Sequence, residues 1–106
     1  MKELIVNGVI FRQGTDAADN TQLINDSEAD WMWFHLEKFP SCHVVVCQST
    51  LDDATISAAA TLVKTNSKYK FKHIGVSYCQ IKNLKHGQNP GSVHFVSKRQ
   101  VKNINI

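Results

Sequence analysis

The second half of this 106-residue chain contains no aspartate or glutamate. All nine acidic residues lie between Glu3 and Asp53, where only three basic residues accompany them, so the first 53 residues carry a net charge of −6. From Ala54 onward, nine basic residues give a net charge of +9. Such asymmetry indicates either a polyanionic partner or two halves that pack together and neutralise each other, and we favour a basic binding face.

Cysteines and long apolar runs are also scarce. The three cysteines, Cys42, Cys47 and Cys79, include no CxxC pair, which argues against a structural zinc site of four ligands. We therefore expect three free thiols and no cofactor. No apolar run approaches the roughly 18 residues of a membrane span, and the N-terminus does not resemble a secretory signal. These absences predict a cytoplasmic protein without a membrane partner.

The residues present predict a single domain, residues 1–106, of the α+β class. Asn7-Gly8 between two apolar runs predicts a β-hairpin. The runs "WMWFHL" (31–36) and "HVVVC" (43–47) are typical of strands that are covered on both faces. Residues 51–66 predict one long helix, with acidic residues in its first turn and lysine near its end. We expect a mixed, mainly antiparallel sheet, this long helix, and room for one short helix after Gly14.

A basic cluster occupies "YCQIKNLKHGQNPGSV", residues 78–93. Lys82, Lys85 and His86 precede two turn signals, His-Gly and Pro-Gly. Ammonium groups on flexible stems suit phosphate contacts, which need no base-specific geometry. Lys98 and Arg99, in the turn before the last strand, would extend this surface, as would the basic residue that follows them, Lys102.

Two histidines border the apolar runs, His35 and His43. They allow a metal or general-base site, but no third ligand has suitable spacing, so hydrogen bonding within the sheet or contact with a nucleic acid is favoured. Trp31, Trp33 and Phe34 could stack on bases, although aromatic residues in such an apolar run are more often core. We favour the core.

Several ordered motifs resemble the NFACT-R domain family. "GTDAADNTQL", "WFHLEKFPSCHVVV", "AATLVKTNSK" and "VSYCQIKNLKHGQNPGSVHF" are similar to the family's GxNxxxNDxL, DxWFH and PGSHVV, AAxLAxxxSK, and VxYTxxKxVKK with GxxPGxV. The similarity covers roughly residues 9–106, and the Leu-Val-Lys-x-Asn-Ser stretch resembles the stand-alone eukaryotic relative, a coiled-coil protein. The family motif positions in this chain are Asp30, Trp33, Phe34, His35, Pro40, His43, Ser67, Lys68, Tyr78, Pro90 and Gly91. The chain departs from the pattern at several positions: Asp30 lies one residue too early, Ser41-Cys42 replaces Gly-Ser, Cys47 stands where a basic residue is common, and Thr15-Asp16 replaces a basic residue and Asn.

This resemblance implies an RNA-binding module of ribosome-quality-control proteins, which engage tRNA and the large ribosomal subunit. We therefore expect a non-catalytic domain that binds structured RNA, either tRNA or rRNA, through its phosphates. The expected nucleic-acid contacts are Lys82, Lys85, His86, Lys98, Arg99, Lys102, Lys68, His35 and His43. Two alternatives stay open. One is a DNA-binding or DNA-sensing module, which the stand-alone relative suggests, and the other is a small metal-dependent hydrolase built on His35 and His43.

Overall fold

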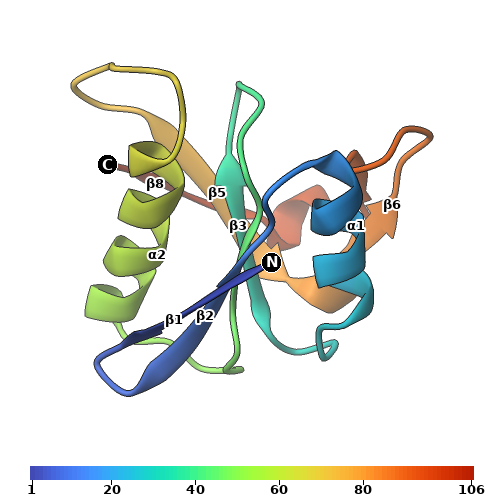
Figure 1. The fold of residues 1–106 in the computed structure, drawn as a ribbon, viewed down its shortest axis with the longest axis horizontal. Helices are drawn as coiled ribbons and strands as arrows, with labels where there is room; N and C mark the ends of the chain where they lie inside the picture. The colour runs from blue at the N-terminus through green and yellow to red at the C-terminus, as the bar shows by residue number, and fades with distance from the viewer.

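The computed structural model describes the whole chain, residues 1–106, as eight strands and two α-helices (Figure 1). The strands are β1 Lys2–Val6, β2 Val9–Gln13, β3 Met32–Leu36, β4 Val44–Val46, β5 Gly75–Gln80, β6 Leu84–His86, β7 Val93–Phe95 and β8 Lys102–Asn105. The α-helices are α1 Ala17–Asn25 and α2 Asp53–Thr65, and two 3₁₀ turns are η1 Ile81–Asn83 and η2 Lys98–Gln100.

A six-stranded antiparallel sheet runs through the centre in the order β1-β2-β4-β3-β5-β8. Strands β6 and β7 form a separate antiparallel ribbon. The β1–β2 hairpin turns at Asn7 and Gly8, whose φ angles are 50° and 79°. Two successive positive φ angles are what a type I′ turn requires, so the predicted hairpin is confirmed.

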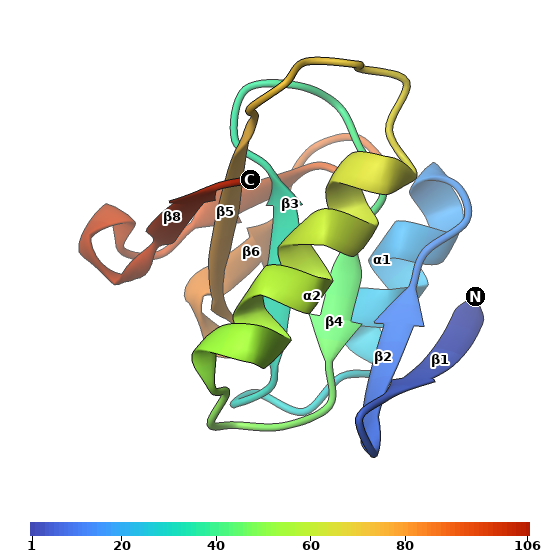
Figure 2. The same ribbon diagram turned by 90° about the vertical axis from the view of Figure 1, so that its left-hand side faces the viewer.

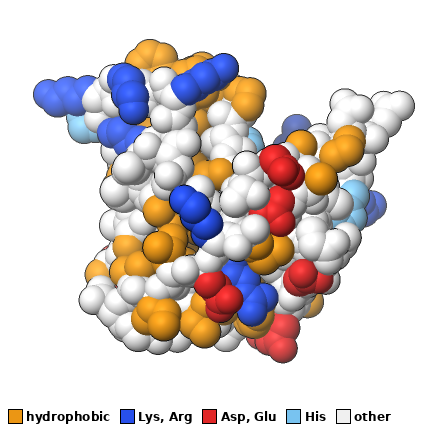
Figure 3. All heavy atoms as spheres, in the orientation of Figure 1, with side chains coloured by type: hydrophobic (Ala, Val, Ile, Leu, Met, Phe, Trp, Pro, Cys, Tyr) orange, Lys and Arg blue, Asp and Glu red, His pale blue; other side chains and the backbone are white.

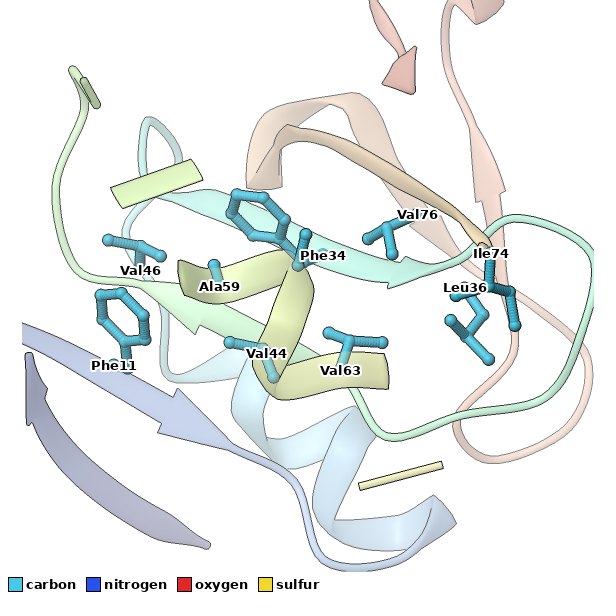
Figure 4. Packing of buried hydrophobic residues seen from close by; sticks show 10 residues of the cluster. Phe11, Phe34, Leu36, Val44, Val46, Ala59, Val63, Ile74 and Val76 are labelled. Carbon is cyan, nitrogen blue, oxygen red and sulfur yellow. The ribbon is translucent and has the colours of Figure 1, made fainter. Parts of the chain in front are cut away.

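Helix α2 covers one face of the sheet. The Asp52 carboxylate accepts a hydrogen bond from the Thr55 N–H (2.8 Å) and caps the helix, with Asp53 in the first turn and Lys64 in the last. These charges complement the helix dipole. The apolar side of the helix packs on residues from β2 to β5 (Figure 4), in a cluster formed by Phe11, Phe34, Leu36, Val44, Val46, Ala59, Ala60, Val63, Ile74 and Val76. Burial of each large apolar side chain in this cluster stabilises the folded state by about 1.5–3 kcal/mol.

Helix α1 and the β6–β7 ribbon cover the opposite face (Figure 2). They pack on the side chains that point away from α2, including Trp33 and Val45. The second cluster comprises Leu23, Ile24, Trp33, Val45, Cys79 and Ile81. Strands β3 and β4 are therefore buried on both faces, as their continuous apolar sequence predicts. Neither helix is long and apolar enough to cross a membrane.

The predicted architecture within the α+β class is wrong in two respects. The sheet is not mixed, because every strand pairing is antiparallel. There is no single long helix over residues 51–66: α2 has 13 residues, and α1, with 9 residues, covers a face of its own. The continuous apolar sequence of β3 and β4 reflects burial on both faces, here by one helix on each side of an antiparallel sheet.

Candidate nucleic-acid interface

A polar pocket of about 760 Å³ opens at one end of the sheet. It lies where β2 ends and β3 connects to β4, with the start of α1 on one side and the end of α2 on the other. Its lining consists of Lys2, Gln13, Gly14, Thr15, Asp16, Ala17, Asn20, His35, Pro40, Ser41, Cys42, His43, Asn66, Ser67, Lys68, Pro90 and Gly91. Four sequence motifs that lie far apart in the chain thus meet at one place.

The segment between β2 and α1 forms one wall and is fixed by close packing. The Gly14 N–H donates to the His43 carbonyl (3.0 Å), and the Asn20 Oδ1 accepts from the His43 N–H (3.2 Å). A Cβ atom at Gly14 would lie 1.9 Å from that same Oδ1. A side chain at this position would therefore force Asn20 to move from its hydrogen bond with His43. Asp16 caps α1 by accepting from the Asp19 N–H (2.8 Å).

Trp33, His35 and His43 form an aromatic group behind the pocket. The Trp33 indole N–H donates to Nδ1 of His43 (3.1 Å), which fixes the remaining proton of the neutral imidazole on Nε2. The His35 ring stacks on Trp33 at 5.6 Å between centroids and meets His43 edge-on at 5.0 Å. His35 lines the pocket and is half-buried, whereas His43 is almost wholly buried.

Both imidazoles are held in the neutral form. Burial lowers the pKa of His43 to about 3, with a further contribution from the nearby His35, although a hydrogen bond to the Gly91 backbone opposes the shift. Burial also lowers the pKa of His35, against the opposing effect of the Leu36 carbonyl, which accepts from its Nδ1 (2.6 Å). Near neutral pH, His35 can accept a hydrogen bond from a ligand at Nε2 but carries no positive charge, whereas both ring nitrogens of the buried His43 are already engaged, by Trp33 and by the Gly91 backbone.

No group of three or more His, Cys, Asp or Glu side chains is arranged to hold a metal ion. His35 and His43 bring only two imidazoles together, and the Nδ1 atom of His43 is already engaged by the Trp33 indole. Two such rings do not form a metal site by themselves.

The connection between β3 and β4 and the loop after α2 supply further hydrogen-bonding groups. Ser41 Oγ accepts from the Leu36 N–H (3.0 Å) and donates to the Cys42 carbonyl (3.0 Å). Ser67 Oγ donates to the Lys64 carbonyl (2.8 Å), which directs the following residue, Lys68, toward the pocket. Only two cationic side chains, those of Lys2 and Lys68, and one carboxylate, that of Asp16, line the pocket.

The Pro90-Gly91 turn closes the pocket on the side of α1. Gly91 has a φ of 80°, and a Cβ there would lie 3.1–3.3 Å from atoms of Ala17. Its N–H donates to Thr21 Oγ1 (2.8 Å). The turn is thus docked on α1. Glycine at this position allows both the left-handed backbone conformation and the close approach to Ala17.

The predicted nucleic-acid contacts fall into two groups. His35, His43 and Lys68 line the pocket, as do the motif residues Pro40, Ser67, Pro90 and Gly91. The other basic residues lie outside it on the exposed surface: Lys82 in η1, Lys85 and His86 in β6, Lys98 and Arg99 in η2, and Lys102 in β8. His86 Nε2 also contacts Asn25 Oδ1 (2.7 Å), which ties β6 to α1. Contact of either group with RNA stays a prediction.

The remaining motif residues lie outside the pocket. Asp30 lies in an exposed turn before β3, five positions ahead of His35 in the sequence. It is not part of the pocket. Trp33 and Phe34 are buried in the two cores, which confirms the preference for core over base stacking for these two residues, whereas Trp31 is only half-buried against the second cluster. Phe34 stacks on Tyr78 at 5.1 Å between ring centroids.

Several pocket residues were absent from the predicted site. Gly14 and Asn20 occupy the glycine and second asparagine of the GxNxxxNDxL pattern, so the motif contained a signal for both. Ser41 and Cys42 depart from the family motif, so the resemblance does not assign them to the site. Nothing in the sequence pointed to Lys2, because its position beside the pocket follows from the pairing of β1 with β2.

Comparison with known proteins gives three findings. The family described as "NFACT protein RNA binding domain" matches residues 5–97. The chain is 36% identical over 99 residues to RqcH, an Rqc2 homolog from Bacillus subtilis, covering 90% of this chain and 17% of RqcH. A solved structure of the C-terminal part of the fibronectin/fibrinogen-binding protein from Streptococcus suis has the same fold, with a TM-score of 0.87 and 24% identity over 98% of this chain and 43% of that one. The chain spans about a sixth of the length of RqcH.

Proposed function

The chain belongs to the NFACT RNA-binding domain family, and from that membership we propose that it is a non-catalytic module that binds structured RNA, such as tRNA or rRNA, through backbone phosphates. RqcH is a homolog of Rqc2, so we place this binding in ribosome quality control in the cytosol, with the large ribosomal subunit as a partner. Recognition of RNA backbone and shape suits A-form duplexes, because their major groove hides the base edges.

One observation carries this proposal. The basic residues from Lys68 to Lys102 are all exposed, and none of them forms a salt bridge. They are Lys68, Lys70, Lys72, Lys82, Lys85, Lys98, Arg99 and Lys102. The acidic residues of the first half do not pair with them, so the charge remains available to a polyanion. In Figure 3, blue side chains gather over the loop between α2 and β5, with no red among them.

A titration with matched nucleic acids tests the proposal. The purified protein is titrated with a tRNA, an RNA hairpin and a DNA hairpin of the same sequence and length, at several salt concentrations. We expect saturable binding to both RNAs and weaker binding to DNA. Equal or tighter binding to the DNA hairpin would favour a DNA-binding module, and no binding to any RNA at low salt would refute the proposal.

Binding inside cells tests the finer part of the proposal. Crosslinking the expressed protein in cells and sequencing the attached RNA should recover tRNA or large-subunit rRNA. Recovery of unrelated messenger RNAs alone would leave an RNA-binding module without a role at the ribosome.

A further inference from the structure

The loop between α2 and β5 alternates basic and aromatic side chains, in the sequence Lys68-Tyr69-Lys70-Phe71-Lys72. The three lysines are exposed, and Phe71 is 51% exposed, although it is a large apolar residue. The loop contains no acidic residue. Apart from Lys68, these residues lie outside the pocket described above.

Three aromatic rings form a connected group at this loop, and we call Phe39, Tyr69 and Phe71 the aromatic strip. Phe39 lies 4.5 Å from Tyr69 and 5.6 Å from Phe71 between ring centroids. Tyr69 and Phe71 are nearly parallel, with 7° between their planes at 6.2 Å. Phe39 and Tyr69 pack against the core beneath α2, so they fix the ring of Phe71 while much of its surface faces solvent.

The backbone that carries the strip is held at both ends. Ser67, which is buried, donates to the Lys64 carbonyl (2.8 Å) and accepts from the Tyr69 N–H (3.3 Å). At the other end, Lys64 Nζ donates to the carbonyls of Lys72 (2.8 Å) and Ile106 (3.0 Å). A loop fixed in this way presents its rings at little cost in conformational entropy on binding.

We propose that the aromatic strip stacks on unpaired bases of RNA, while the lysines beside it contact the phosphates of the same single strand. This inference rests on the proposed function and adds a second class of RNA segment to it. Aromatic rings combined with cationic side chains are the means by which proteins bind single strands without reading their sequence. A duplex stacks its bases on one another and offers no free base face except at its ends.

The charge of the loop favours a nucleic acid over an apolar protein segment as the occupant. Lys38 precedes Phe39, so four lysines are sequence neighbours of the three rings, and one carboxylate, that of Glu37, lies beside Gly75 in a hollow that Phe39 and Phe71 also line. Lys68 Nζ lies 5.7 Å from the Tyr69 ring centroid and also lines the pocket. A strand stacked on the strip would therefore continue toward the pocket.

The test compares an unstructured RNA of mixed sequence with a blunt RNA duplex of the same length, by fluorescence anisotropy. Phe71→Leu keeps an apolar side chain but removes the aromatic face. We expect it to weaken binding to the single strand about tenfold, within the range measured for one stacked base. Binding to the duplex should stay within about twofold. Phe71→Trp should retain single-strand binding, and Ile5→Ala, which removes an apolar side chain 76% exposed on β1, serves as the control.

A second readout reports stacking directly. The fluorescence of 2-aminopurine in the single strand should fall on binding the wild-type protein and the Phe71→Trp variant, and much less on binding Phe71→Leu. If Phe71→Leu binds the single strand as tightly as the wild-type protein does, the strip does not stack on bases. The same conclusion follows if this variant loses as much affinity for the duplex as for the single strand. A wild-type protein that binds only the duplex would also overturn this inference while leaving the proposed function intact. Binding of neither RNA would overturn both.

Discussion

Removal of Lys82 and Lys85 should make RNA binding measurably less dependent on salt. Both side chains are exposed and neither forms a salt bridge. Lys82 lies in the 3₁₀ turn η1, and Lys85 points outward from β6, directly opposite His94 of β7. If each meets one phosphate, it releases counterions and contributes about 0.7 to 0.9 to the slope of log K against log salt concentration. The double change to alanine should therefore flatten that slope by about 1.5.

The same variant should keep its stability. No side-chain hydrogen bond or ion pair is lost, so the free energy of unfolding should change by no more than about 0.5 kcal/mol. Loss of affinity could then not be attributed to misfolding. Unfolding in urea gives the stability, and anisotropy titrations at four or more salt concentrations give the slope.

The control for this experiment preserves charge at the same positions. Changing Lys82 and Lys85 together to arginine should leave the slope within about 0.3 of wild type, because the counterion effect depends on charge rather than on the shape of the cation. The alanine variant should also bind unrelated structured RNAs with affinities reduced by similar factors, since phosphate contacts carry no sequence information. An alanine variant with unchanged affinity and slope would refute the assignment of these lysines as phosphate contacts.

Three further predictions concern the stability of the pocket and the state of the thiols. Gly14→Ala should lower the free energy of unfolding by about 1–3 kcal/mol, because the new Cβ displaces Asn20 and leaves a buried N–H of His43 without its partner; an unchanged midpoint in urea would contradict this packing. The pKa of His43 is lowered to about 3 in the folded protein, so only the unfolded chain takes up its proton as the pH falls below about 6.5, and stability should decrease by up to about 1.4 kcal/mol per pH unit toward pH 3. Urea unfolding between about pH 7 and pH 4 should show this decline, and His43→Gln should reduce it. Alkylation in denaturant without reductant should give three adducts, whereas in the native protein Cys79 should react last, because it is buried and burial raises its pKa to about 11; a single adduct in denaturant would indicate a disulfide.

Local signals in the sequence predicted the elements whose cause is local. The pair Asn7-Gly8 specifies its turn by backbone conformation alone, and the charges at the ends of α2 indicate a helix in this segment, although not its length. The extent of α2 differed because Asp52 caps it, so the helix begins at Asp53. Propensity and capping act over a few residues and can be read from a short window.

The arrangement of the sheet and the pocket depends on contacts between distant segments. Nothing local in Trp33 and His43 indicates that an indole N–H of one strand donates to a buried imidazole beside the next. Nor does the sequence near Gly91 show that this turn docks on Thr21 of α1. The basic cluster can be recognised in the sequence because its residues lie close together in the chain. The pocket cannot be recognised in this way, because its lining is assembled from separate parts of the chain. The family resemblance supplied seven of the seventeen lining residues, since it groups residues by motif rather than by local pattern.

The wide spacing of the pocket residues has a consequence for how the pocket forms during synthesis. Lys2 and Gly14 lie near the start of the chain, whereas Pro90 and Gly91 lie near its end, and the last strand, β8, pairs with β5. An emerging chain can form the β1–β2 hairpin early, but it has no complete pocket until these late residues have been made and docked on α1. The pocket is therefore completed only when these late residues have folded, and a truncated product that ends before them would carry exposed lysines without a complete pocket.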